Sequence, residues 1–562
     1  MNFKFYIRLL IIVCFTIPLN SSTSTAPQNN TYLDDETYAI NILNYYTNHT
    51  YMFVRPVFNS LSFQQSSWHH ALYHKQKNGF AAQIGGIYEQ SYSNLYNPAY
   101  FFFDFKNELT ISAGTPSTFN PLTATSTTSG GTTTSSSNPQ FSVKNPLIGQ
   151  INVPSGNRDV LGQWVGITKS TDQDLKITLD PQQEQMCLFL EVSQDLNRIF
   201  QSDLFENWFI NVALPITLVR NNIGITGDQK AVNAFGQTAF NYIRMSPNTH
   251  ESFRVTQAII SLGTRYMSQD DIEIFMTSGV LVPLVEQSCD SYLFSPVQGY
   301  NSHFGFNTEV HFQFPLIYEK NNPSRILFFA DVQNIFLARN HQLRTYDIRN
   351  RPFSRYMQLL DSYTNQLVPA MNVLTIRSRV EPYNVVNFMT GFRFAHHNCY
   401  GEIGYELWAH GTERITPEPK VTHREGWFDN YRYGIPFINA DGVLAKVNPE
   451  TGVVEAINTN IENGLTSSLS TINYVASPDG DYECCPSPSF IPSNQYIAIK
   501  DLEIYTAGSR STITHKGFFS VGLGKDGEKR NYFVNFGAFI EASQNNAALN
   551  FWGGWFKGGF TF

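Results

Sequence analysis

The sequence of 562 residues predicts an all-β fold, a transmembrane antiparallel β-barrel of about 14 strands, within a range of about 12 to 16, with long external loops. Three observations predict this fold. The chain ends on a strand with period-two alternation, it begins with an export signal, and it combines 14% aromatic residues with a mean hydropathy of only -0.24. Lipid-facing and lumen-facing side chains alternate and cancel in an average, so a barrel can be rich in aromatic residues without being hydrophobic overall.

The terminal strand, residues 550–562, reads NFWGGWFKGGFTF. Successive side chains of a strand point to opposite faces. One face of this strand is wholly apolar and carries Trp552, Phe556, Phe560 and Phe562. The opposite face carries Lys557, as expected for a wall between lipid and a wet lumen.

This strand resembles the closing strand of bacterial outer-membrane β-barrels, the porins and transporters as a class, which commonly end in Phe with aromatic residues at alternate positions before it. The resemblance covers residues 78–562. It implies a location in the bacterial outer membrane, contact with outer-membrane lipid, and recognition of the C-terminal strand by the barrel-assembly machinery.

The N-terminus reads MNFKFYIRLLIIVCFTIPLN, with two basic residues before an apolar run and a Ser/Thr/Ala stretch after it. This pattern is typical of a secretory signal peptide, which we expect to span residues 1–26, with cleavage between about Asn20 and Ala26. The apolar run is too short to span a bilayer, and no later stretch provides the roughly 18 unbroken apolar residues that a membrane helix needs. Residues 27–77 form an N-terminal segment that we expect to precede the barrel or to lie in its mouth.

Charge and cysteine content exclude several classes of protein. The chain carries 38 Lys and Arg against 46 Asp and Glu, a net charge of -8 without a basic run, so nucleic acid is not an expected partner. The cysteines beyond the signal peptide show no CxxC spacing. Cys484 and Cys485 are adjacent, and two alternatives fit: a bridge from one of them to Cys289, or isolated thiols.

Alternating segments recur from residue 78 to the C-terminus, and we expect each to be a barrel strand. In order they are residues 78–91, 100–113, 175–179, 185–196, 204–219, 254–267, 271–284, 303–318, 325–337, 385–395, 400–409, 514–525, 531–541 and 550–562. The turns SQD, EKNNPS, HHNC and KDGEKR are short, as periplasmic turns are. All four fall at the end of the barrel that carries Phe562.

The long connections predict external loops. Residues 114–140 are a low-complexity Ser/Thr loop, and 340–380 and 411–513 are large insertions. Residues 231–243 and 349–360 have helical character. Strand parity places the Ser/Thr loop on the periplasmic side, against the rule that long loops are external. Either a strand is miscounted in the N-terminal half, or this segment enters the lumen.

The polar face of each predicted strand gives the residues expected to face the lumen. These are Glu89, Glu191, Arg265, Glu309, His311, Asp331, Arg393, Glu402, Glu406, Glu541 and Lys557. Carboxylates outnumber fixed positive side chains, so we expect a wet and mildly acidic lumen. Such charges chiefly hydrate a lumen and pair across strands, and they line a path for cations or neutral polar solutes only if no loop fills the bore.

No signature of a common enzyme class is present, since GxSxG, HExxH and P-loop motifs are all absent from the sequence. Barrel enzymes with Ser/His or Asp/His pairs are an alternative, and His396, His397 and His515 lie near strand ends, but spacing places no Ser or Asp beside them. His70 and His74 would share a helical face, without a third metal ligand in view. We therefore expect no catalytic residues, no cofactor and no metal.

The predicted function is a porin-like outer-membrane channel for passive diffusion of small polar or cationic solutes. A surface-exposed structural or adhesive barrel is a second interpretation, supported by the large external loops. A third rests on Asn97, Pro98 and Ala99, which resemble the Asn-Pro-Ala triplet in the N-terminal hatch of outer-membrane long-chain fatty-acid transporters. That resemblance implies an apolar ligand, whereas the expected lumen residues are polar and the triplet here runs into a predicted strand.

Overall fold

The structure is a computed structural model that describes residues 46–68, 79–112, 174–418 and 497–562, with short gaps inside these ranges, and a few short stretches between them. Within these residues no helix is long and apolar enough to cross a membrane. Several predicted features lie outside the described residues. They are the signal peptide 1–26, the Ser/Thr loop 114–140, much of 411–513, the pair His70 and His74, and the cysteines Cys289, Cys484 and Cys485.

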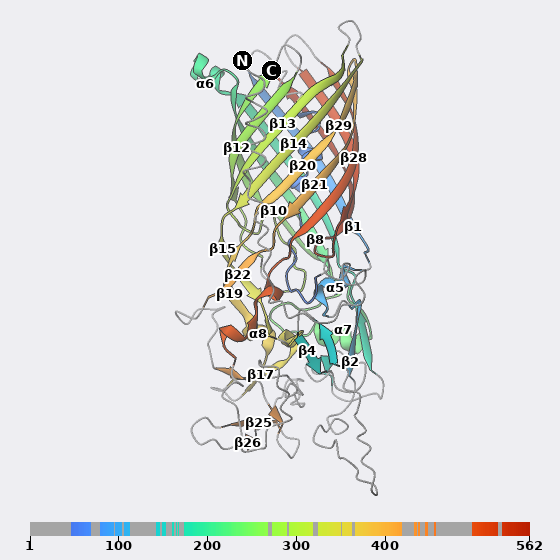
Figure 1. The fold of residues 1–562 in the computed structure, drawn as a ribbon, viewed down its shortest axis with the longest axis vertical. Coiled ribbons are helices and arrows are strands. Elements are labelled where there is room, and N and C mark those ends of the chain that lie inside the picture. The colour runs from blue at the N-terminus through green and yellow to red at the C-terminus, as the bar shows by residue number, and fades with distance from the viewer. Residues whose placement is uncertain are drawn as a thin grey trace. The chain divides into compact units, whose positions relative to one another are not determined.

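Twelve described strands form a closed antiparallel wall (Figure 1). In order around the ring they are β8 (Trp208–Asn222), β11 (Gln257–Met267), β12 (Glu273–Pro283), β13 (Gly305–Tyr318), β14 (Ser324–Leu337), β20 (Val385–His396), β21 (Cys399–His410), β28 (Thr512–Lys525), β29 (Asn531–Ser543), β30 (Asn550–Thr561), β1 (Phe80–Tyr92) and β7 (Gln182–Asp195). Pairing of β7 with β8 closes the ring, and β10 (His250–Val255) continues the line of β11 along β8. The predicted fold class is confirmed, with a strand number at the lower end of the predicted range.

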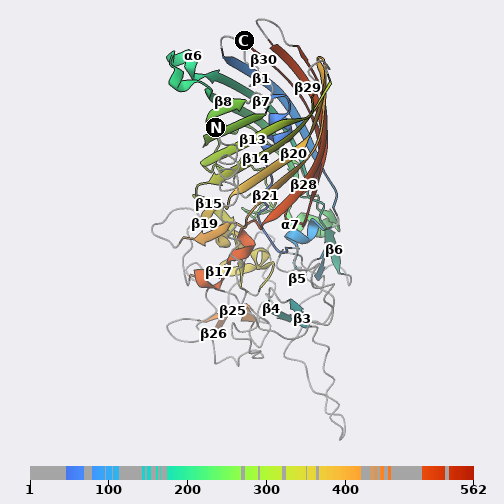
Figure 2. The same cartoon turned by 45° about the horizontal axis from the view of Figure 1, so that its top comes forward.

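The C-terminal strand β30 lies between β29 and β1, so the first and last wall strands meet at one seam (Figure 2). Phe562 and Phe80 exchange two backbone hydrogen bonds of 3.0 Å there. Trp552, Phe556 and Phe560 are exposed, whereas Lys557 is buried. The aromatic side chains of β30 therefore point out of the ring and its lysine points in.

Large apolar side chains are exposed over the outer face of the wall. Examples from around the ring are Ile84, Leu188, Leu262, Phe306, Phe336, Phe392, Ile403, Val521, Phe536 and Phe556. An apolar surface of this extent is not stable in water, and a closed ring leaves no strand edge without hydrogen bonds. The chain is a membrane-spanning antiparallel β-barrel.

Two predicted wall strands, residues 100–113 and 175–179, are wrong. The structure has α5 (Pro98–Phe101), β2 (Glu108–Ser112) and β6 (Leu175–Thr178) there, and the two strands belong to a separate sheet with β5 (Val160–Leu161) and β9 (Thr226–Gly227). Their apolar side chains, such as Leu109, Ile111 and Ile177, are buried inside this external part of the protein, which produces the same alternation as a lipid-facing strand.

Because β2 and β6 are not wall strands, strand parity no longer conflicts with the rule that long loops are external. β1 and β7 are paired wall strands, so the whole connection between them, residues 93–181, leaves and re-enters the barrel at the end opposite Phe562. At the Phe562 end the connections are short, and one of them carries α6 (Leu196–Phe200) and η5 (Asp203–Phe205), which project from the rim (Figures 1 and 2).

The other insertions form small sheets and helices, which we name the external region together with the sheet of β2. They are α7 (Gln229–Phe235), β15 (Asn340–Thr345), β16 (Asp347–Ile348), η6 (Ser354–Tyr356), β17 (Gln358–Asp361), β18 (Gln366–Pro369), α8 (Ala370–Leu374), β19 (Thr375–Glu381), β22 (Arg414–Pro417), β23 (Tyr433–Gly434), β27 (Leu502–Glu503) and η10 (Ile504–Ala507). The helix predicted at 349–360 is wrong, and the one predicted at 231–243 is confirmed only in its first half. In both places aromatic side chains pack into the core of the external region and override the local pattern.

Candidate functional site

Residues 46–68, which we name the plug, run from the external region into the barrel. At its beginning the backbone N–H of Tyr46 donates to Oδ1 of Asn546, in the external turn between β29 and β30, at 2.8 Å. Near its end Ser67 donates to the hydroxyl of Tyr400, beside a short turn at the opposite rim, at 2.5 Å. The plug contains η1 (Val57–Asn59) and α3 (Leu61–Gln65) and thus runs along the lumen, deeper than the mouth of the barrel.

A cluster of buried charges fixes the plug to one side of the wall. The Arg55 guanidinium lies 2.5 Å from Glu541, 3.1 Å from Glu406 and 3.5 Å from Glu89. Lys516 lies 3.6 Å from Glu406 and 3.5 Å from Glu541. We name these five residues the central charge cluster, and all five are buried. The cluster joins the plug to β1, β21, β28 and β29.

Wall side chains also bind both ends of helix α3. The Glu406 carboxylate accepts hydrogen bonds from the backbone N–H groups of Leu61 and Ser62, at 3.2 and 3.1 Å, and from the Ser62 hydroxyl at 2.7 Å. At the other end the Lys557 ammonium donates to two carbonyl oxygens of α3, at 2.6 and 2.9 Å. An anion at a helix N-terminus and a cation at its C-terminus both stabilise the helix, because they satisfy free backbone groups and oppose its dipole.

The other predicted lumen residues form pairs across strands. Arg393 lies 2.6 Å from Glu402, and His311 lies 2.8 Å from Asp331. These four side chains are buried. Arg265 is half-buried near the Phe562 rim, where it lies 2.7 Å from Asp195.

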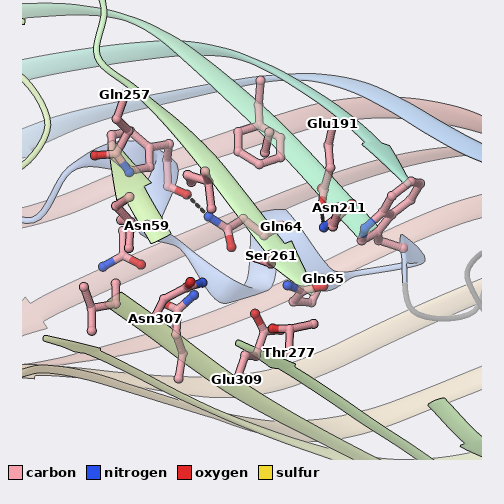
Figure 3. A pocket seen from close by; sticks show the side chains of 18 of the residues that line it. Asn59, Gln64, Gln65, Glu191, Asn211, Gln257, Ser261, Thr277, Asn307 and Glu309 are labelled. Atoms are coloured by element: carbon pink, nitrogen blue, oxygen red, sulfur yellow. Dashed lines mark hydrogen bonds between the residues drawn. The ribbon is translucent and has the colours of Figure 1, made fainter. Parts of the chain in front are cut away.

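A pocket lies between the plug and the opposite side of the wall, formed by β7, β8 and β11 to β14 (Figure 3). Amide side chains, two carboxylates and aromatic rings line it. Its lining includes the amides of Asn59, Gln65, Asn211, Gln257 and Asn307, the acids Glu191 and Glu309, and the rings of Phe58, Trp68, Phe189, Phe275 and Tyr300. None of the described lining residues is Lys or Arg.

The structure therefore separates the predicted lumen acids into two groups. Five of them hold the plug or pair with a cation or imidazole of the wall, as described above. Glu191 and Glu309 alone among the seven line the pocket. Glu191 accepts hydrogen bonds from the amides of Gln83 and Asn211. Among the described acids predicted to face the lumen, these two are therefore the pocket's carboxylates.

Aromatic side chains meet across the lumen near the Phe562 rim, and we name this group the aromatic constriction. Trp68, at the end of the plug, packs with Phe533 of β29 at a ring-centroid distance of 6.4 Å, and Phe209 of β8 stacks on Phe275 of β12 at 4.9 Å. β12 and β29 lie on opposite sides of the twelve-strand ring, so the group bridges the lumen. Apolar constrictions exclude water and thereby block ions.

The remaining candidates do not join this site. Asn97 precedes α5 at the external end, away from the pocket, and α5 contacts the beginning of the plug, where the Tyr100 hydroxyl donates to the Tyr51 carbonyl at 2.7 Å. His396 lies 2.8 Å from the Ser324 hydroxyl at the exposed rim, a Ser/His pair that spacing did not reveal, and His515 contacts Tyr405. Among the described residues, no group of three or more His, Cys, Asp or Glu side chains could hold a metal ion.

His303, at the external end of β13, makes the external region sensitive to pH. Burial lowers its pKa to about 4, although its hydrogen bond to the Ala338 carbonyl, at 2.7 Å, acts in the opposite direction. The amide of Gln342 lies 2.9 Å from its other ring nitrogen, as the neutral ring requires.

Since the folded pKa lies below the usual value of about 6.5, His303 stabilises the fold above that pH, and this contribution is lost as the pH falls towards 4. The loss should reach roughly 3 kcal/mol. Limited proteolysis of the external region between pH 7 and pH 4 should show rising cleavage, and His303→Gln should flatten the profile. Equal profiles for the two proteins would contradict this role.

Comparisons with known proteins give only distant similarities. No protein-family model matches the sequence, and no curated protein matches it. Among solved structures, an outer membrane channel from Pseudomonas putida F1 aligns with a TM-score of 0.29 and 8% identity over 85% of this chain and 94% of that one. A FadL homologue from Pseudomonas aeruginosa aligns with a TM-score of 0.26 and 7% identity over 91% of this chain and 99% of that one. Both TM-scores are low, so neither similarity assigns a function to this chain.

Proposed function

We propose that this protein is a plugged outer-membrane channel for small polar or cationic solutes, with the path running between the plug and the wall strands β7 to β14. The observation that carries this proposal is the pocket beside the plug, with its amide and carboxylate lining. The central charge cluster holds the plug against β1, β21, β28 and β29, and thereby leaves the other side of the lumen less filled.

The pocket extends along the barrel rather than across it. On β12 alone its lining reaches from Phe275 to Leu281, a separation of six residue positions or about 20 Å along the strand. Phe275 belongs to the aromatic constriction as well, so the pocket reaches the constriction. A solute that has entered from the external end would therefore pass on only when Trp68 moves away from Phe533.

The polar lining disfavours the apolar-ligand interpretation. An alkyl chain in the pocket would separate the Glu191 and Glu309 carboxylates and the amides from polar partners. This burial costs free energy, and an alkyl chain forms no hydrogen bonds that would compensate for it. The adhesive interpretation requires no path at all. A conductance recording therefore distinguishes an adhesive barrel from a channel.

The test of the path is its ion selectivity. Purified protein in a planar bilayer should prefer cations at low salt, and Glu309→Gln should reduce this preference. One carboxylate about 4 Å from a passing ion contributes about 1 kcal/mol, or about fivefold in local cation concentration. The cation preference should also weaken in high salt, because the Debye screening length is shorter there.

Glu184→Gln is the matched control, because Glu184 is a partly exposed acid of β7 that pairs with Arg220 and does not line the pocket. Glu406→Gln is unsuitable, since Glu406 holds the plug. Selectivity that is the same in Glu309→Gln, Glu191→Gln and the control would place the path elsewhere.

A further inference from the structure

The pocket gathers polar atoms that have no hydrogen-bond partner among the described residues. Five of them are Nδ2 of Asn59, Oε1 of Gln65, Nε2 of Gln257, Oη of Tyr300 and Oδ1 of Asn307. Each of these five side chains is at most 8% exposed. Four of them are labelled in Figure 3, where they come from the plug and from different wall strands around one space. A buried polar atom without a partner costs about 1 to 3 kcal/mol, so five in one pocket need an explanation.

These atoms include both donors and acceptors. The amide nitrogens of Asn59 and Gln257 donate, the amide oxygens of Gln65 and Asn307 accept, and the Tyr300 hydroxyl can do either. The Oδ1 atom of Asn59 already accepts from Asn387 at 2.8 Å, which leaves its amide nitrogen for a ligand. A ligand that satisfies the whole set must itself both donate and accept.

Aromatic faces complete the lining. Phe58, Phe189, Phe275 and Tyr300 line the pocket, and the rings of Phe58 and Tyr300 are in edge contact at a centroid distance of 6.0 Å. Flat apolar faces next to a few placed polar groups give a site both area and specificity.

We infer that the pocket is a binding site for a neutral polyhydroxylated solute of the saccharide class, an inference that rests on the proposed channel and names what it carries. Each hydroxyl both donates and accepts, and the C–H faces of a sugar ring lie flat on aromatic rings. An organic cation would suit the carboxylates and rings but leaves the amide donors of Asn59 and Gln257 without partners. An anionic solute would meet Glu191 and Glu309 without a compensating cation in the described lining.

The experiment measures block of the ion current through the purified full-length protein by added maltose or sucrose. Current should fall with saccharide concentration and saturate. Tyr300→Phe removes only a hydroxyl, and Gln257→Met replaces an amide with an apolar group of similar length. Each variant should weaken saccharide affinity about fivefold, the equivalent of one hydrogen bond. Tyr88→Phe is the matched control, because Tyr88 lies on the outer face of β1 against Trp552, and its saccharide affinity should equal that of the wild type.

Both pocket variants should assemble normally, since neither removes a hydrogen bond between described side chains of the pocket, and heat-modifiable migration of the folded barrel checks this. A current that saccharides do not block, or that tetramethylammonium alone blocks, overturns the inference and leaves the channel in place. Unchanged saccharide affinity in both variants overturns it as well. If no current flows at any voltage, the channel proposal fails, and calorimetric titration of maltose into the protein then decides the binding site by the same variants.

Discussion

Replacing Arg55 with alanine should release the plug and raise the single-channel conductance. Arg55 is the only described plug cation in the central charge cluster, and it contacts Glu89, Glu406 and Glu541. With all groups ionised, three carboxylates and two cations give the cluster a charge of about -1, and Arg55→Ala changes it to about -2. Removing one partner of a buried ion pair costs about 3 to 5 kcal/mol, because the other charges stay buried. If the plug leaves the lumen, the remaining charges of the cluster are hydrated again.

The measurement is conductance in planar bilayers, with heat-modifiable migration as the check on assembly. Arg220→Ala is the control, because Arg220 also pairs with two acids, Glu184 and Glu251, but is partly exposed at the external end of β8. Pairs of this kind contribute about 1 kcal/mol or less. Adding Glu541→Gln to Arg55→Ala returns the cluster to about -1 and should lower the conductance again.

An assembled Arg55→Ala barrel with wild-type conductance would show that other contacts hold the plug. The strongest candidate is at its external end. There Arg355 donates to the Asn48 side chain at 3.0 Å and to the Phe101 carbonyl at 3.1 Å, and it pairs with Asp347 at 2.5 Å. Arg355 thus ties the plug to the external region.

The wall was predictable because the membrane imposes a simple rule on it. Each strand must alternate between lipid and lumen, and the ring must close, so period-two segments with short turns at one end identify most wall strands. The rule fails where another apolar environment replaces lipid. Leu109 and Ile177 alternate in the same way as wall residues, but the core of the external region buries them.

The site was less predictable, because it depends on which side chains face each other across the lumen. The period-two alternation predicts that Glu89, Glu406 and Glu541, from three different strands, face the lumen. No local sequence pattern indicates that these three side chains converge. Lys516 lies on the polar face of β28, opposite Glu406 in the strand register, and could have been found by the same alternation. Arg55 lies in a segment without period-two or helical repetition, so only the folded structure reveals its partners.

The second large effect is expected from the outer face of the closing strand. Phe556 lies near the middle of β30, is 52% exposed and packs on Phe536 at a ring-centroid distance of 4.9 Å. Phe556→Arg places a charge near the middle of the lipid, which costs about 2 to 4 kcal/mol, and loses the ring contact. Because β30 pairs with both β29 and β1, damage to it opens the ring on both sides. The heat-modifiable form should disappear from the outer-membrane fraction.

Tyr96→Arg is the matched control, since Tyr96 is also 52% exposed but lies in the external region, where an arginine meets water. It should leave the amount of folded barrel unchanged. A second variant without Phe562 tests the seam directly, because Phe562 exchanges two backbone hydrogen bonds with Phe80 and its ring lies 5.0 Å from that of Phe80. Normal amounts of folded Phe556→Arg protein would mean that the outer face of β30 is covered by protein instead of lipid, and the seam between β30 and β1 would then be an interface.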